Sequence, residues 1–148
     1  DAPGLARMAD DVEKRLKALG AAVERRKATV GHSEVLIARF TGTGKRKLML
    51  QGHMDTVYWP GTLKTQPYKE DGNRLYGPGI ADDKGGLAVM MHAVALLHAS
   101  GWKDYAQLTL LVNGDMLPEA VWFYPEPSEG HDELKGRVAF WKGVTVSA

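Results

Sequence analysis

Residues 47–55 of the chain read Lys47-Leu48-Met49-Leu50-Gln51-Gly52-His53-Met54-Asp55. A short apolar run of this kind is typical of a buried strand in a mixed or parallel sheet. The run leads directly into a histidine and an aspartate. Ligands of open α/β sheets bind just beyond the carboxyl ends of the strands. This stretch therefore predicts both the class of fold and the place of a functional site.

Helical and strand-like segments alternate on both sides of this run. Apolar residues at intervals of three or four predict an amphipathic helix from Gly4 to Gly20. A second helix, Leu87 to His98, is apolar nearly all round, so we expect it to be buried. Strands are expected at 21–29, 34–40, 107–113, 120–124 and in the tail 136–148, with an Asp-Gly hairpin of half-buried strands at 68–76. Strands interleaved with helices indicate a layered α/β domain.

The composition is that of one globular domain. The chain has 148 residues, of which 44% are hydrophobic and 25% charged, which excludes a disordered or coiled-coil protein. With 19 basic and 18 acidic residues the formal charge is +1, so neither nucleic acid nor a membrane surface is an expected partner. The absence of cysteine excludes disulfides, thiolate catalysis and cysteine-ligated zinc. The compartment stays open between the cytoplasm and a periplasmic or secreted location.

The connection between the last two central strands is too short for a parallel sheet. Parallel strands need a crossover of about a dozen residues or more, usually a helix. Only Met116, Leu117, Pro118 and Glu119 separate Asp115 from the strand expected at Ala120. Either the two strands form an antiparallel hairpin, or a crossover segment is missing between 115 and 120. We favour a missing segment, for the reason given with the family resemblance below.

His53 and Asp55 form the first candidate constellation. A metal-binding imidazole usually has its second ring nitrogen held by a carboxylate, which fixes the tautomer. Asp55, two residues beyond His53 in an extended segment, is placed to do this. The alternative is a histidine at the end of a strand with a solvated aspartate nearby.

Asp82 and Asp83 form the second candidate, in a glycine-rich turn before the helix expected at Leu87. Asp83 as a helix N-cap would explain one aspartate, because carboxylates are favoured near the positive end of a helix. It does not explain two aspartates flanked by four glycines, Gly77, Gly79, Gly85 and Gly86. A carboxylate at this position is suited to bridge metal ions.

Glu126 is the third candidate, because Pro125 and Pro127 hold the backbone around it extended at the end of an apolar strand. An ordinary loop glutamate is the alternative. For His92 and His98, both on the predicted second helix, packing is the better interpretation, and His131 is expected in a solvated loop.

Two longer stretches carry a family resemblance. They are Leu50-Gln51-Gly52-His53-Met54-Asp55-Thr56-Val57 and Tyr76-Gly77-Pro78-Gly79-Ile80-Ala81-Asp82-Asp83-Lys84-Gly85-Gly86. Together they resemble the signature segments of the dinuclear zinc exopeptidases, which include glutamate carboxypeptidases, aminoacylases and succinyl-diaminopimelate desuccinylases. The resemblance is greatest to the glutamate carboxypeptidase branch, and it runs from the first helix to the final strands.

The resemblance implies a three-layer α/β catalytic domain, present here in part, without the lid or dimerisation domain and the C-terminal half. It implies two zinc ions, with His53 as a terminal ligand, Asp82 as the bridge and Asp55 as the residue that orients His53. Glu126 would share a metal with His53. Enzymes of this family cleave an amide bond in a small peptide or an N-acyl amino acid with a metal-activated water and a glutamate general base, and some form homodimers.

The chain departs from the family pattern after the strand at 107–113. The family has Asp-Glu-Glu there, supplying the general base and a ligand of the second metal, whereas Asp115 is followed by Met116. No general base is identified, and at most one full zinc site, His53, Asp82 and Glu126, is visible. Neither Glu119 nor His131 has a spacing that supports it as a replacement.

Two functional hypotheses follow. In the first, the chain is an incomplete catalytic domain of a metal-dependent amide hydrolase. In the second, it is a non-catalytic or degenerate domain that binds one metal or none and acts as a scaffold. A nucleotide site in the loop 77–86 is not supported, because the loop lacks both the GxGxxG pattern after a strand and a Walker pattern. The substrate and the identity of the metal are not determined by the sequence.

Overall fold

A computed structural model describes residues 2–27 and 33–114 of the chain. Residues 1–115 form one compact unit, which contains all of the described residues. Its helices and strands, in chain order, are α1 (Ala2–Ala18), β1 (Ala22–Lys27), β2 (Glu34–Thr41), β3 (Lys47–His53), β4 (Lys69–Asp71), β5 (Arg74–Tyr76), α2 (Gly85–Ala99) and β6 (Gln107–Asn113). The strands and helices predicted for this part of the chain are all present.

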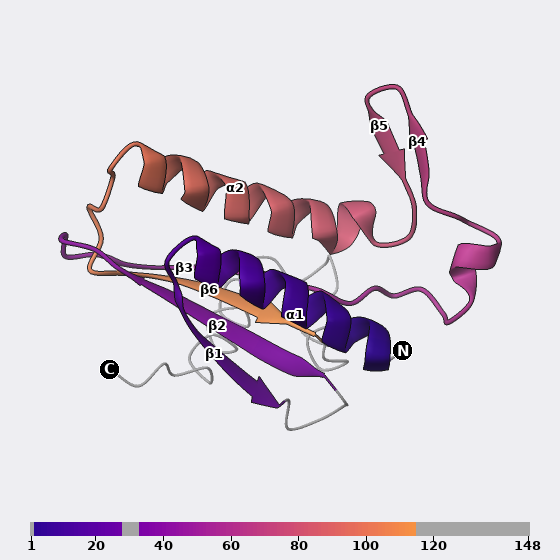
Figure 1. The fold of residues 1–148 in the computed structure, drawn as a ribbon, viewed down its shortest axis with the longest axis horizontal. Coiled ribbons are helices and arrows are strands. Elements are labelled where there is room, and N and C mark those ends of the chain that lie inside the picture. The colour runs from indigo at the N-terminus through magenta and orange to yellow at the C-terminus, as the bar shows by residue number, and fades with distance from the viewer. Residues whose placement is uncertain (1, 28–32, 115–148) are drawn as a thin grey trace, which may run out of the picture. The chain divides into compact units, whose positions relative to one another are not determined.

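Four strands form a mixed sheet in the order β1-β2-β6-β3 (Figure 1). β1 pairs with β2 and β2 with β6 in antiparallel register, whereas β3 and β6 run parallel. The parallel pair places His53 opposite Asn113. Since α2 lies between β3 and β6 in the chain, it provides the crossover that a parallel pair requires. Both strands therefore end at the same edge of the sheet.

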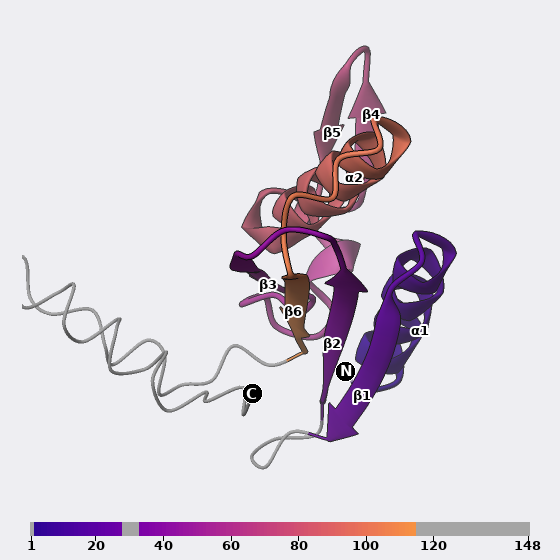
Figure 2. The same cartoon turned by 90° about the vertical axis from the view of Figure 1, so that its left-hand side faces the viewer.

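Both helices cover the same face of this sheet. Every second residue of β2 and β6 enters one core cluster, which also contains Val12 of α1 and Leu87 of α2. Figure 2 shows α1 and α2 on one side of the four strands. The strand residues in this cluster are Leu36, Ala38, Phe40, Leu108, Leu110 and Val112. The described residues thus form an α/β unit, as predicted, with two of the three layers that the family resemblance implies.

An arginine cluster fixes α1 against the antiparallel strands. The Arg25 guanidinium on β1 donates to Asp10 (2.6 Å) and Glu13 (3.1 Å) on α1, and it also pairs with Glu34 on β2. These three carboxylates raise the pKa of Arg25 well above its usual range. The cluster therefore links three elements through one charged side chain.

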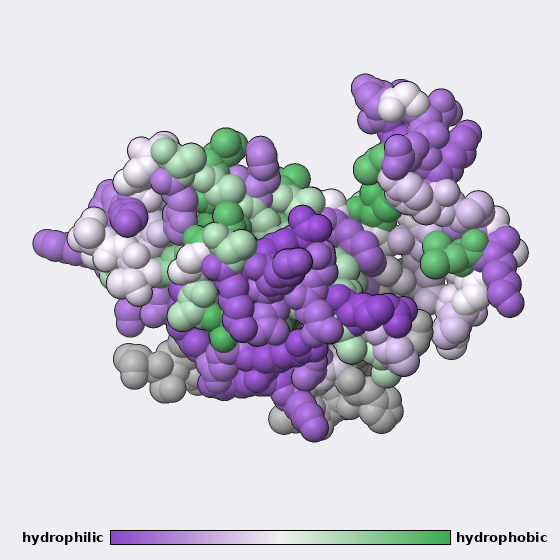
Figure 3. All heavy atoms as spheres, in the orientation of Figure 1, coloured by the Kyte–Doolittle hydropathy of each residue, from purple (hydrophilic) through white to green (hydrophobic). Residues whose placement is uncertain are grey.

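Two expectations about burial are wrong. Along α2 only Leu87 and Val94 are buried, whereas Val89 is 69% and Leu96 59% exposed. Figure 3 shows hydrophobic side chains gathered over α2, in contrast to the hydrophilic outer face of α1. The reason is that the sheet covers one side of α2, and no other described element packs on its opposite side. The hairpin β4–β5 is likewise exposed throughout rather than half-buried.

The strands predicted at 120–124 and 136–148 lie outside the described residues. So does the predicted break between Asp115 and Ala120. Neither of the two described α-helices has the length and apolar character that a membrane crossing requires.

The core predicts a clear contrast between two leucines. Leu110 is fully buried at the centre of the sheet, whereas Leu75 on β5 is exposed. Leu110→Ala should lower the free energy of unfolding by about 2–5 kcal/mol, because it leaves a cavity. Leu75→Ala should change it by no more than about 0.5 kcal/mol. Urea unfolding followed by circular dichroism measures both, and equal effects would contradict this description of the core.

Candidate metal centre

His53 is the last residue of β3 and lies between two carboxylates. Its Nδ1 is 3.1 Å from Asp55 Oδ1, and its Nε2 is 2.9 Å from Asp82 Oδ1. The side chains of His53 and Asp55 are 17% and 16% exposed, whereas that of Asp82 is 68% exposed. The predicted contact between His53 and Asp55 is therefore present, and Asp82 reaches the other ring nitrogen from a distant part of the chain.

The turn before α2 brings the two aspartates to the end of β3. Gly79 opens the turn with a left-handed backbone conformation at φ 74°, and Asp82 and Asp83 then have extended φ values of −127° and −129°. The peptide bond that joins the two aspartates is cis. Both carboxylates reach His53, Asp82 at the imidazole ring and Asp83 at the backbone N–H.

Asp83 does not serve as an N-cap of α2. The capping position is Lys84, and no side chain caps the helix there. Instead, Asp83 Oδ2 accepts a hydrogen bond of 3.3 Å from the backbone N–H of His53. The N-cap interpretation is wrong because the carboxylate is engaged by the neighbouring strand rather than by its own helix.

Gly52 allows this close approach between α2 and β3. A Cβ atom at this position would lie 2.6 Å from Asp83 Oδ2 and 2.8 Å from side-chain atoms of both Leu87 and Met90. Real Cβ contacts essentially never fall below 3.0 Å. A residue larger than glycine would thus push the start of α2 away from His53.

Comparison with known proteins identifies the part of the chain that carries this site. Residues 49–115 match the Peptidase family M20/M25/M40. We call residues 49–115 the M20 segment after this match, which covers less than half of the chain. It contains His53, Asp55, Asp82 and Asp83, so the family resemblance drawn from the sequence is confirmed.

Two curated relatives are similar to a part of the chain longer than the M20 segment. The chain is 43% identical to carboxypeptidase G2 of Pseudomonas sp. (strain RS-16) over 118 residues, which cover 78% of this chain and 28% of that protein. It is 35% identical to a putative succinyl-diaminopimelate desuccinylase of Mycobacterium tuberculosis over 92 residues, 62% of this chain and 24% of that protein. The chain therefore spans about a quarter of the length of these relatives.

Solved structures support the fold. An M20 family metallo-carboxypeptidase from Sulfolobus solfataricus aligns with a TM-score of 0.65 and 21% identity, covering 75% of this chain and 26% of that one. An aminopeptidase PepT from Bacillus cereus aligns with a TM-score of 0.64 and 24% identity. This alignment covers 82% of this chain and 34% of the aminopeptidase chain. At this level of identity the alignments establish the M20 catalytic-domain fold of the described part.

A second family matches the later part of the chain. Residues 92–147 match a family described as a domain of unknown function, DUF427, so the two matches overlap over residues 92–115. Glu126, Glu119 and His131 lie outside the M20 match, inside the second match and outside the described residues. The M20 match thus gives no support to Glu126 as a metal ligand, and that role stays a prediction.

The described M20 residues fit two positions of a metal centre. An imidazole nitrogen and a carboxylate oxygen are ordinary zinc ligands, and in a tetrahedral site two such atoms lie about 3.3 Å apart. The 2.9 Å between His53 Nε2 and Asp82 Oδ1 is close to this value. Among residues 2–27 and 33–114, however, no three His, Cys, Asp or Glu side chains are grouped to hold a metal. The site as described is therefore one imidazole with an aspartate on each ring nitrogen, Asp55 on Nδ1 and Asp82 on Nε2.

Lys84 is a residue of this region that the sequence analysis did not single out. Its Nζ donates a 3.4 Å hydrogen bond to the carbonyl oxygen of Met54, inside the turn between His53 and Asp55. Partial burial lowers the pKa of Lys84, and the charge of Asp55 opposes this shift. The sequence feature that could have identified Lys84 is its position directly after Asp82 and Asp83, inside the stretch that carries the family resemblance.

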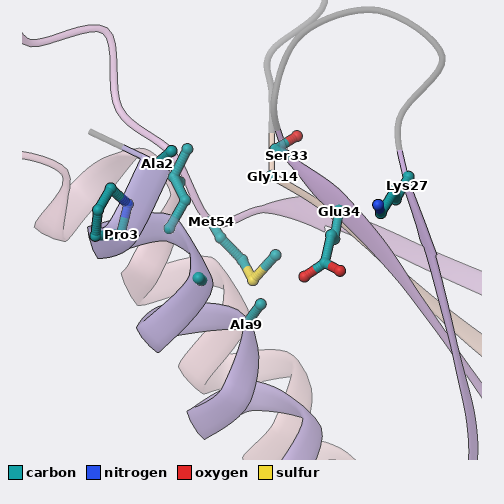
Figure 4. A pocket seen from close by; sticks show the side chains of 10 residues that line it. Ala2, Pro3, Ala9, Lys27, Ser33, Glu34, Met54 and Gly114 are labelled. Atoms are coloured by element: carbon teal, nitrogen blue, oxygen red, sulfur yellow. The ribbon is translucent and has the colours of Figure 1, made fainter.

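Two cavities lie beside the candidate metal centre rather than at it. One of about 540 Å³ is bounded by the start of α1 and by Met54, Ser33 and Glu34, and Figure 4 shows Met54 and Ala9 facing the Glu34 carboxylate across it. Another of about 360 Å³ is bounded by Met54, Asp55, Trp59 and Lys84. Neither is lined by His53 or Asp82, so neither by itself marks where a substrate meets the metal ligands.

The close approach at Gly52 leads to a prediction. Gly52→Ala should lower the free energy of unfolding by about 1–3 kcal/mol, because the added methyl group overpacks the contact with α2. It should also weaken the hydrogen bond from the His53 N–H to Asp83. Urea unfolding and the amide proton shift of His53 measure the two effects. Wild-type stability together with an unchanged amide shift would show that α2 does not approach β3 as described.

Proposed function

We propose that the M20 segment of this chain carries part of the metal centre of a metal-dependent amide hydrolase. In this proposal His53 and Asp82 are metal ligands and Asp55 orients His53. The single observation that carries it is the arrangement of His53 between two carboxylates, one on each ring nitrogen. The carboxypeptidase, desuccinylase and deacetylase named among the relatives support the class of reaction.

The different roles proposed for Asp55 and Asp82 follow from their contacts with the two ring nitrogens of His53. Asp55 accepts a hydrogen bond from Nδ1–H, which leaves the lone pair of Nε2 available as a ligand. The Asp82 side chain is 68% exposed, and the two oxygens of a carboxylate would allow it to bridge two ions. A bound zinc supplies a water of lowered pKa and polarises the carbonyl that is attacked. The protein's own part at this position is to hold the ligands in place and to exclude the wrong tautomer.

The substrate class is a small peptide or an N-acyl amino acid. This part of the proposal rests on the names of the relatives, which include an acetylornithine deacetylase and a β-Ala-Xaa dipeptidase.

We also propose that the M20 segment ends close to residue 115. The M20 match and the compact unit both end at Asp115, and the next residues fall in the match to the second family. In this interpretation the strands predicted at 120–124 and 136–148 belong to the second family, so no crossover between them and β6 is needed. It also means that Met116 and Leu117 stand where the family has its glutamate pair. The 148-residue chain would then bind metal without turning over substrate. It would thus have the metal ligands of the hydrolase hypothesis and the lack of catalysis of the second hypothesis.

Zinc binding tests the proposed ligands. The purified chain should bind zinc, and both His53→Ala and Asp82→Asn should weaken binding by about tenfold or more, because each removes a ligand. Binding is measured by competition with a chromogenic chelator, and folding of each variant is checked by circular dichroism. His92→Ala is the matched control, since His92 is exposed on α2, distant in sequence from both ligands. Equal affinities for all four proteins would rule out the proposed centre.

Glu126→Gln distinguishes the two interpretations of the later part of the chain. If the M20 segment ends near residue 115, this variant should bind zinc as the wild type does. If Glu126 is the third ligand, as the sequence predicts, its affinity should fall by about tenfold or more. The same chelator competition measures the difference, with Glu119→Gln as the control.

A further inference from the structure

Lys84 connects the first turn of α2 to the segment that orients His53. It lies half-buried at the N-cap of α2, immediately after the two aspartates. From there its side chain reaches the 54–56 segment, where Nζ donates to the carbonyl oxygen of Met54. Met54 itself is buried, with 2% of its surface exposed. The lysine therefore bonds to the backbone at a buried residue, one residue from His53 on one side and from Asp55 on the other.

The space for this side chain depends on Gly79. A Cβ atom on Gly79 would lie 2.8 Å from Lys84 Nζ and 2.2 Å from Cγ2 of Thr56. The left-handed conformation of Gly79 adds a second reason for glycine at this position. The turn before α2 is thus shaped around the ammonium group as well as around the two aspartates.

Asp55 and Lys84 lie on the same cavity, of about 360 Å³, which both side chains line. A half-buried ammonium group needs polar partners, and charges attract more strongly where water is partly excluded. Asp55 in turn is hydrogen-bonded to Nδ1 of His53. Lys84 is therefore linked to the imidazole through the backbone of Met54, the residue before Asp55, and through the Asp55 carboxylate.

We propose that Lys84 is a positioning residue of the metal centre, which holds the Met54–Asp55 segment so that the Asp55 carboxylate stays on Nδ1 of His53. This inference rests on the proposed function, because it assigns Lys84 to the ligand His53. A simpler alternative is that Lys84 only anchors the start of α2. The two roles differ in what they change: an anchor affects stability, whereas a positioning residue affects the histidine ring and its affinity for metal.

Two measurements on the full chain separate these roles. Lys84→Met should raise the zinc dissociation constant by about tenfold, the scale on which groups that orient a ligand act. In the metal-free protein it should also speed exchange of the His53 Nδ1–H proton, followed by nitrogen-correlated NMR of the ring. Lys84→Arg, which keeps a cationic donor, should restore both properties. Lys64→Met, at an exposed lysine, is the control and should change neither.

The outcomes are distinct. Loss of zinc affinity and faster ring-proton exchange in Lys84→Met, with rescue by arginine, support the inference. Unchanged affinity and exchange in a folded Lys84→Met protein overturn it, even if stability falls. If the wild type binds no zinc, the proposed function fails. The role of Lys84 is then tested only by the exchange rate of the His53 Nδ1–H proton in Lys84→Met compared with the wild type. If Lys84→Met does not fold, Lys84→Gln replaces it and must show the same two losses.

Discussion

The close approach of α2 to the end of β3 at Gly52 is the constraint on which the candidate site depends. Because Gly52 has no side chain, Asp83 lies near enough to accept a hydrogen bond from the His53 N–H. That contact fixes the turn before α2, and the turn carries Asp82 to Nε2 of His53. The absence of a side chain at Gly52 thus allows His53 and Asp82, which are 29 residues apart in the sequence, to come into contact.

The parallel pairing of β3 and β6 gives this constellation its position in the fold. Both strands end at one edge, with His53 opposite Asn113, and the crossover helix α2 returns to that edge. The alternate residues of β2 and β6 enter the core under the helices, so Val35, Ile37 and Leu111 project from the other face. No helix of the described part covers that face. The described unit therefore has two layers, the sheet and the pair of helices on one of its faces.

The α-helices, the strands and the contact between His53 and Asp55 were predictable from the sequence, whereas the role of Asp83 and the exposure of α2 were not. Helix and strand patterns and the Asp-Gly turn predicted both α-helices and all six described strands, but not the short helical turn Thr62–Lys64. The His53-x-Asp55 spacing predicted the contact on Nδ1, because residues two apart in an extended segment lie on the same side. The role of Asp83 was not predictable, since an aspartate before a helix is usually an N-cap and only the packing at Gly52 diverts it. The exposure of Val89 and Leu96 could not be predicted either. A helix that is apolar all round is buried only if other helices or strands pack on both of its sides. The hydrophobic pattern of the helix itself does not show whether such elements are present.

The central claim is that His53 and Asp82 bind one metal ion together. X-ray absorption at the zinc edge of the zinc-loaded chain tests it most directly, because it counts the imidazole and oxygen ligands around the ion. The structure predicts one imidazole nitrogen, with carboxylate or water oxygens completing the shell at about 2.0–2.2 Å. The imidazole contribution should vanish in His53→Ala and persist in His92→Ala. A shell with no imidazole in the wild type, or one unchanged by His53→Ala, would contradict the account.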